Sequence, residues 1–260
     1  MRISAIFLPF FAVVAGAAGF YIRRLELFSI FNDFTGLPLR GAGITTVLIA
    51  VSAAFFLIAL VFAIRVAVKH KAEPGFENSF DTDHAAYPVV LSVIGAVWLG
   101  VTVKRFIDLL SLEQYPVIEL LFLIMSALAA ISVAFLAIEM FQDPRRKLVV
   151  VLSVVPTLFM CFWLIMMYRE NATNPILISY AYHCLAIITA TLGFYFTSGF
   201  AYNKPAPGKA VFFYLAAIYF CFVTLADDHA VTDKIIFIAI IAINTVYVSM
   251  LIRNLKWKES

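Results

Sequence analysis

The sequence has few charged residues. Asp, Glu, Lys and Arg make up 13% of the 260 residues, whereas 63% are hydrophobic. A soluble domain carries about 25% charged residues and under about 50% apolar ones. This composition therefore excludes a soluble globular protein. The net charge is only +3 and the basic residues are spread along the chain, so nothing supports a nucleic-acid partner either.

Cysteine and the motifs of familiar enzymes are also lacking. The three cysteines lie within apolar runs and form no C-x-x-C pair: Cys161, Cys184 and Cys221. We expect reduced, packed thiols rather than a disulfide or a metal site. There is no P-loop, G-x-S-x-G or H-E-x-x-H motif, and the acidic stretch at 81–84 lacks the later residues of a calcium loop. The sequence therefore predicts no metal and no cofactor.

Long apolar runs are what the sequence has instead. A helix of about 20 residues crosses the ~30 Å hydrocarbon layer at 1.5 Å per residue, and these runs do not alternate as barrel strands do. We therefore predict an all-α transmembrane helix bundle, a single integral membrane domain with eight spans. The spans are 3–22, 44–68, 88–103, 117–141, 148–168, 176–202, 210–226 and 235–252.

The distribution of Lys and Arg predicts which way the spans face. Cytoplasmic loops of membrane proteins carry an excess of these residues. Of the 19 basic residues, twelve fall on the side of the two termini and seven on the other side. We therefore predict that both termini face the cytoplasm.

The first apolar run has two interpretations. It resembles a short signal peptide with an A-x-A cleavage site at Ala15 and Ala17, and cleavage there would leave seven spans. The run continues to Ile22, however, which is long enough to span. Its small residues Gly16 and Gly19 suit close packing against another helix. We favour retention of this run as the first span.

A loop after the first span carries a resemblance to known proteins. The segment R-R-L-E-L begins at Arg23, and F-N-D-F-T-G-L-P-L-R-G begins at Phe31. Together they resemble a junction in uncharacterised multi-pass membrane proteins of Gram-positive gut bacteria. The resemblance implies a bacterial plasma membrane and brings no assigned activity.

Three polar residues within the apolar runs are candidates for function. An ionisable group within the hydrocarbon costs roughly 2.5 to 3.5 kcal/mol on insertion scales, so such a group is a functional candidate by default. Glu119 lies in the first turn of the fourth span, and His183 lies about 10 Å below the outer end of the sixth. His183 fits a neutral imidazole bonded to a neighbouring helix, a proton relay or a ligand-binding group. For Asn244, in the eighth span, we predict a polar contact with a neighbouring helix.

The stretch T-L-A-D-D-H, from Thr224 to His229, follows the seventh span on the predicted outer side. Adjacent side chains point apart, so this run cannot form a metal site by itself. The plain interpretation is a solvated helix end. The alternative hypothesis is that Asp227 and Asp228 close an outer-facing polar vestibule over His183 and Glu119.

These observations leave three classes of function. The first is a permease-like or channel-like protein with the outer vestibule as its entrance. The second is an accessory or sensory membrane subunit that acts through helix–helix contacts. The third is an outer-leaflet enzyme, against which the missing motifs argue. The expected partners are the lipid bilayer and either other membrane subunits or a second copy of the chain.

Overall fold

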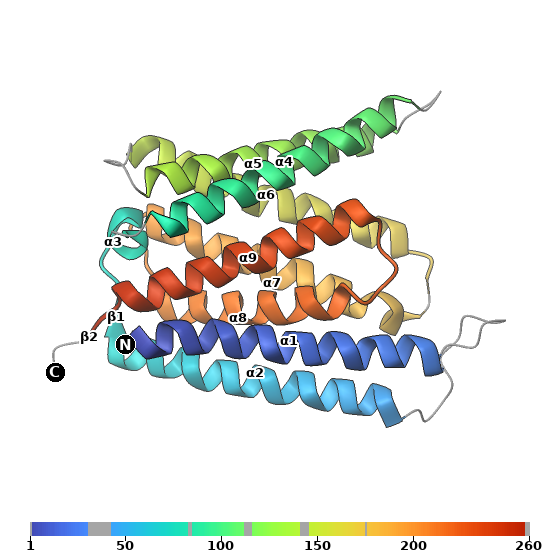
Figure 1. Cartoon of the computed structure of the whole chain (residues 1–260), viewed down its shortest axis with the longest axis horizontal. Coiled ribbons are helices and arrows are strands. Elements are labelled where there is room, and N and C mark those ends of the chain that lie inside the picture. The colour runs from blue at the N-terminus through green and yellow to red at the C-terminus, as the bar shows by residue number, and fades with distance from the viewer. Residues whose placement is uncertain are drawn as a thin grey trace.

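The computed structural model describes residues 2–30, 43–82, 85–111, 116–140, 146–174 and 176–257. The segment from Phe31 that carries the resemblance, and half of the acidic stretch at 81–84, lie outside these residues. Within them the elements are α1 (Arg2–Ile30), α2 (Gly43–Lys69), β1 (His70–Lys71), α3 (Phe76–Phe80), α4 (Ala86–Leu110), α5 (Val117–Glu139), α6 (Arg146–Asn171), α7 (Leu177–Ala201), α8 (Pro207–Thr224), α9 (Val231–Asn254) and β2 (Lys256–Trp257) (Figure 1).

Eight of the described helices, all except α3, are long and apolar enough to cross a membrane. The predicted all-α bundle with eight spans is therefore confirmed, and the chain is a multi-pass membrane protein. Several helices extend past the predicted ends: α1 continues from 22 to Ile30 and α4 from 103 to Leu110. Hydropathy falls at the first charged residues, whereas the backbone hydrogen bonds of a helix continue through them.

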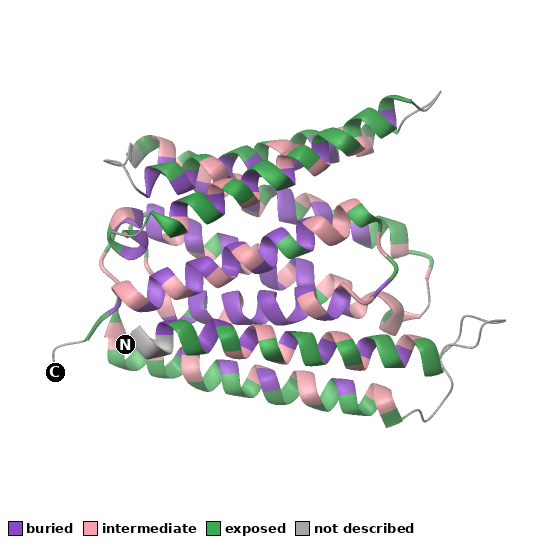
Figure 2. Cartoon of the chain, in the orientation of Figure 1, coloured by how far each residue is buried: buried purple, intermediate pink, exposed green. Residues whose placement is uncertain are grey.

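Helices α4 to α9 form a closed ring. Each helix packs against the next one along the chain, and α9 packs back against α4. Helices α1 and α2 lie outside this ring, where α1 contacts α8 and α9 and α2 contacts α8 and α1. Helix α8 is therefore enclosed by its neighbours, and α8 and α9 are buried over most of their length while α2 is mostly exposed (Figure 2).

Glycine allows α1 to approach α8 closely. A Cβ atom at Gly16 would come within 2.8 Å of Phe222, and one at Gly19 within 2.7 Å of Val223. Both distances are shorter than normal van der Waals contact. The close packing predicted for these two positions is thus present, and it holds α1 against the most buried helix of the bundle.

The beginning of α1 and the end of α9 lie at the same end of the bundle (Figure 1). We call this the terminal end. Here β1 and β2 pair antiparallel, with His70 opposite Trp257, and α3 packs against α9. Helices α2, α5, α7 and α9 begin at the other end, which we call the opposite end.

The orientation predicted from the basic residues has a direct test. Asn78 near the terminal end and Ser111 at the opposite end are both exposed, so each can be replaced by a single cysteine. With the three native cysteines replaced by alanine, we expect an impermeant thiol reagent added to intact cells to label the Ser111 site only. Labelling of the Asn78 site alone would reverse the orientation.

Candidate functional site

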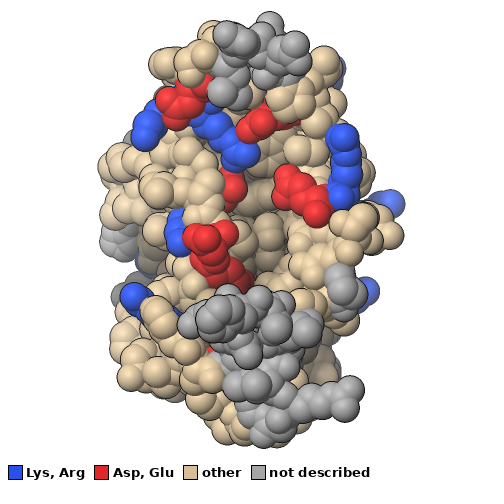
Figure 3. All heavy atoms as spheres, turned by 90° about the vertical axis from the view of Figure 1, so that its right-hand side faces the viewer, with Lys and Arg blue, Asp and Glu red and all other residues tan. Residues whose placement is uncertain are grey.

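A polar pocket opens at the opposite end, inside the ring of helices. Its volume is about 450 Å³, and its walls come from α4, α5, α6, α7, α9 and the segment that joins α8 to α9. Figure 3 looks onto this end and shows acidic side chains around a hollow in the middle of the face. The pocket therefore lies at the ends of the candidate membrane-spanning helices.

Carboxylates dominate the charged lining of the pocket. Glu170 comes from the last turn of α6, Asp227 and Asp228 from the segment between α8 and α9, and Asp233 from the first turn of α9. Arg105 of α4 is the only basic residue among the described residues that line the pocket, apart from two histidines. The charged groups of the lining are thus predominantly negative.

The first of two ion-pair networks lies behind the pocket wall and centres on Arg23. Its guanidinium Nε donates to Asp227 Oδ1 at 2.8 Å, and Nη1 donates to Glu26 Oε2 at 2.7 Å. Arg23 and Glu26 are fully buried, with exposed fractions of 0% and 1%. Nη2 donates to the carbonyl oxygens of Ile178 and Ser179 at 3.2 and 3.4 Å. Arg23 thereby joins α1 to α7 and to the segment between α8 and α9.

Burial raises the pKa of the Asp227 carboxyl, and the neighbouring Arg23 opposes this rise. The Thr224 hydroxyl also donates to Asp227 Oδ2 at 3.1 Å. Both carboxylate oxygens of Asp227 are therefore engaged. This residue holds the joining segment in place and leaves no oxygen free of a protein partner.

The second network lies on the other side of the pocket and centres on Arg105. Its Nη1 donates to Asp233 Oδ1 at 2.6 Å, and its Nη2 donates to Glu119 Oε1 at 3.1 Å. The central carbon of the guanidinium also lies 5.2 Å from the centroid of the Phe122 ring. This network joins α4, α5 and α9, and its members are partly exposed.

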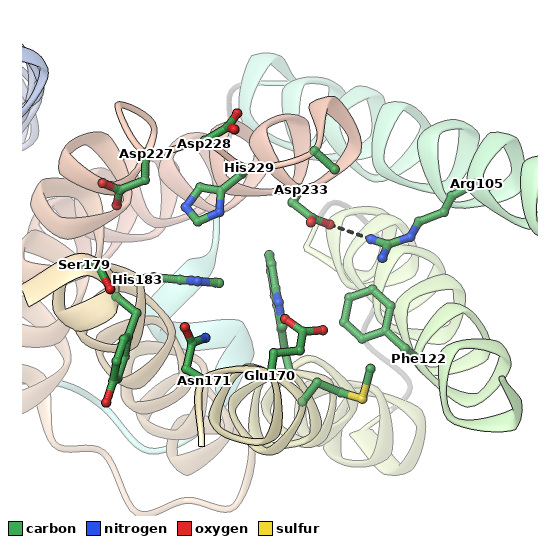
Figure 4. A pocket seen from close by; sticks show the side chains of 14 residues that line it. Arg105, Phe122, Glu170, Asn171, Ser179, His183, Asp227, Asp228, His229 and Asp233 are labelled. Atoms are coloured by element: carbon green, nitrogen blue, oxygen red, sulfur yellow. Dashed lines mark hydrogen bonds and ion pairs between the residues drawn. The ribbon is translucent and has the colours of Figure 1, made fainter. Parts of the chain in front are cut away.

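Two histidines meet between the networks. The rings of His183 and His229 have centroids 4.5 Å apart and lie edge to face; Figure 4 shows His229 pointing toward His183. Because the Thr224 hydroxyl donates to Asp227, it accepts from His229 Nε2 at 2.9 Å, which assigns the imidazole proton to Nε2. The Nε2 atom of His183 is buried and has no hydrogen-bond partner among the residues that the structure describes.

Aromatic side chains form the floor of the pocket. Trp163 and Phe122 line it, with ring centroids 5.8 Å apart, and Phe159 lies beneath both at 5.6 and 5.3 Å. Trp98 continues the cluster 5.5 Å from Phe159. These separations are typical of favourable aromatic pairs. The pocket is thus closed toward the centre of the bundle by packed rings.

The structure brings three of the predicted vestibule residues together. His183, Asp227 and Asp228 line the same pocket, and Ser179, four residues before His183 on α7, lines it too. Glu119 is not part of the lining and reaches it through Arg105. The four predicted residues therefore lie at one end of the bundle, three in the pocket lining and Glu119 behind it.

Asn244 lies in the core, far from the pocket lining. Its Nδ2 donates to the backbone carbonyl oxygen of Ile240, one turn earlier in the same helix, at 2.8 Å. Its Oδ1 is buried, has no hydrogen-bond partner in the described part of the chain, and faces Gly193 of α7, where a Cβ atom would lie 3.0 Å away. Among the described residues, the predicted interhelical contact is thus a close approach to Gly193, while the amide hydrogen bond of Asn244 stays within α9.

Several residues of the site were not predicted. Arg23 and Glu26 are spaced three residues apart, which is the signal of a pair on one helix face, but they lie beyond the predicted end of the first span. Arg105, Glu170 and Asp233 stand near helix ends, where charged residues are common. Among the described residues, no group of three or more His, Cys, Asp or Glu side chains could hold a metal ion.

Replacing Arg23 should destabilise the protein strongly. Arg23→Gln leaves Glu26 and Asp227 buried without their cation, and breaking a buried pair in this way costs about 3–5 kcal/mol. Arg24→Gln, at the exposed neighbouring position, should change stability by less than about 0.5 kcal/mol. Thermal unfolding in detergent compares the two. The double variant Arg23→Gln/Asp227→Asn should recover part of the lost stability, because it also removes one of the unpaired carboxylates. Equal melting temperatures for Arg23→Gln and Arg24→Gln would show that the network contributes little.

His229 should make stability depend on pH. Burial lowers its pKa from the usual 6.5, with Asp227 opposing. Below pH 6.5 the unfolded chain therefore binds a proton that the folded protein does not. Stability should fall as the pH decreases from 6.5 to the folded pKa, by up to about 1.4 kcal/mol per pH unit.

The measurement for His229 is a difference between two proteins. Asp227, whose pKa is raised, titrates with the opposite sign, so the wild-type slope alone is ambiguous. In thermal unfolding, the melting temperature of His229→Gln should fall less than that of the wild type as the pH decreases below 6.5. Parallel pH profiles would contradict the assignment.

Comparison with known proteins gives no relative: no protein-family model, curated protein or solved structure matches the chain. The likeness of the loop after the first span to proteins of Gram-positive gut bacteria therefore stays a prediction. The membrane character of the chain follows from its eight apolar helices, and its activity has to be inferred from the pocket.

Proposed function

We propose that this protein is a permease-like protein of a bacterial plasma membrane, whose outer-facing vestibule binds cationic solutes. The observation that carries the proposal is the charge of the pocket: four carboxylates and one arginine line a single cavity of about 450 Å³. A cleft lined by one sign of charge attracts ligands of the other sign and raises their local concentration.

The free carboxylates define where a cation would bind. Arg23 holds Asp227, and Arg105 holds Asp233. Glu170 and Asp228 line the pocket, are exposed, and form no ion pair with any residue that the structure describes. In Figure 4 the Glu170 carboxylate reaches into the cavity from α6. These two groups are therefore available to a ligand, while the paired ones keep the walls in place.

The remaining lining favours an organic cation over a bare ion. The cavity lies within the range of about 300–1,000 Å³ that is usual for small-molecule sites. Trp163, Phe122 and Tyr180 present aromatic surface beside the acidic groups, and such rings attract cations and pack against apolar groups. An ammonium group attached to a hydrocarbon or aromatic body matches both kinds of surface.

One observation favours a second function. The packed rings of Trp163, Phe159 and Trp98 close the pocket toward the centre of the bundle. A vestibule that binds a ligand without passing it on would suit the sensory or accessory membrane subunit. Binding and flux therefore have to be measured separately.

The charge preference can be tested with three probes that share one hydrocarbon body: phenylethylammonium, phenylacetate and phenylethanol. We expect phenylethylammonium alone to raise the melting temperature of the purified protein, because only it complements the carboxylates. Glu170→Gln should weaken this effect, whereas Glu77→Gln, on α3 at the terminal end, serves as the matched control. A response to phenylacetate equal to that of the amine would overturn the proposal.

Flux distinguishes the two candidate functions. Proteoliposomes that contain the protein should take up labelled phenylethylammonium faster than empty ones, and Glu170→Gln should slow the uptake. Binding of the amine without uptake would support the sensory alternative and rule out the permease-like function for this probe.

A further inference from the structure

A second cavity, separate from the polar pocket, lies on the outside of the bundle between α2 and α7. It is a groove of about 760 Å³ whose floor includes Phe220 of α8. Ala53 and Leu57 of α2 lie on one side, and Ala181 and Leu185 of α7 lie on the other. No charged side chain is among its described lining residues, so the groove is an apolar surface.

The polar groups of this groove are hydroxyls that the protein itself engages. Ser52 donates to the carbonyl oxygen of Leu48 at 2.8 Å and lies 2.9 Å from the Tyr219 hydroxyl. Tyr182 lines the groove with a ring that faces Arg23 at 5.1 Å on its other side. The groove therefore offers hydrocarbon contacts to an occupant.

The groove has the depth of one membrane leaflet. Its α2 side runs from Ile49 to Leu60, about 16 Å at 1.5 Å per residue, and its α7 side from Leu177 to Leu185, about 12 Å. Half of a ~30 Å hydrocarbon layer is about 15 Å. Both helices begin at the opposite end, so the groove extends from that membrane surface to about the middle of the bilayer.

The mouth of the groove favours an anionic group. Both helices begin at the opposite end, and the first turn of α7, with Leu177 and Ile178, lines the groove there, whereas α2 begins at Gly43, six residues before its first lining residue Ile49. The N-terminus of a helix carries unpaired N–H groups and a partial positive charge, which favour phosphate. An apolar channel one leaflet deep, with the N-terminus of α7 at its mouth, matches a phospholipid in both its parts.

We propose that the groove between α2 and α7 is a phospholipid site, in which one acyl chain of a lipid from the leaflet at the opposite end lies against Phe220. A transmembrane helix is a poorer occupant. With side chains it is about 10–12 Å wide, and helices pack with axes 8–10 Å apart. Because α2 and α7 both already pack on α8, another helix would rest on their outer rims, whereas a single chain reaches the floor.

The site borders the network that holds the polar pocket. The carbonyl oxygen of Ile178 accepts from Arg23, and Tyr182 stacks against the same guanidinium, while both residues line the groove. A bound acyl chain therefore packs against the residues that position Arg23. This proposal does not depend on the pocket's ligand or on transport.

Mapping with a photoreactive lipid tests the site in the unaltered protein. Wild-type protein is reconstituted in vesicles of phosphatidylethanolamine and phosphatidylglycerol that contain phosphatidylglycerol with a diazirine on one acyl chain. After irradiation and digestion, we expect labelled peptides to concentrate in 49–60 and 177–185. Labelling spread evenly over all lipid-facing helices would overturn the proposal.

A matched pair of variants tests whether the groove retains lipid. Ala53→Phe fills the groove, whereas Ala54→Phe places the same ring on an exposed face of α2 that does not line it. In native mass spectrometry we expect wild type and Ala54→Phe to keep one phospholipid that Ala53→Phe loses. Equal retention by both variants would contradict the site.

The oligomeric state separates the lipid from a protein occupant. A dimer in wild type that Ala53→Phe converts to a monomer, without a change in bound lipid, would show that a second copy covers the groove. If Ala53→Phe fails to fold, Ala181→Phe fills the groove from α7, and the photolabelling of wild type stands without any variant.

Discussion

The burial of Arg23 constrains the rest of this end of the molecule. A guanidinium within the bundle is costly unless carboxylates and hydrogen-bond acceptors surround it. Glu26 supplies one partner from the same helix, but Asp227 has to come from the segment between α8 and α9. Fixing Asp227 also fixes His229 two residues later, and this places its ring 4.5 Å from His183. One buried cation thus determines where the segment crosses the pocket.

The acidic residues at the opposite end have two different tasks. Asp227 and Asp233, bound by Arg23 and Arg105, join parts of the chain that are 204 and 128 residues apart in the sequence. Glu170 and Asp228 join nothing among the described residues and remain exposed in the cavity. Walls held by paired charges keep the unpaired charges in position, which is the preorganisation that binding requires.

The sequence predicts the helices well and the site in part, for a physical reason. The length of an apolar run follows from the thickness of the bilayer, so eight spans can be counted without a structure. His183 and Asp227 were identifiable because polar groups in or beside apolar runs are costly. Arg23 was not, since hydropathy ended the first span one residue before it, although α1 continues to Ile30. Arg105 and Asp233 form an ion pair although they are 128 residues apart in the sequence. Residue spacing predicts contacts within one helix, but not a contact between distant helices.

Helix α7 connects the two cavities because it presents a different face to each. Ser179 and His183, one turn apart, line the polar pocket, while Ile178, Ala181 and Leu185 line the apolar groove. A rotation of this helix would change both cavities at once, and the bonds from Arg23 to its first turn resist such a rotation. The two faces of α7, one toward the polar pocket and one toward the apolar groove, are therefore held in position by the same arginine.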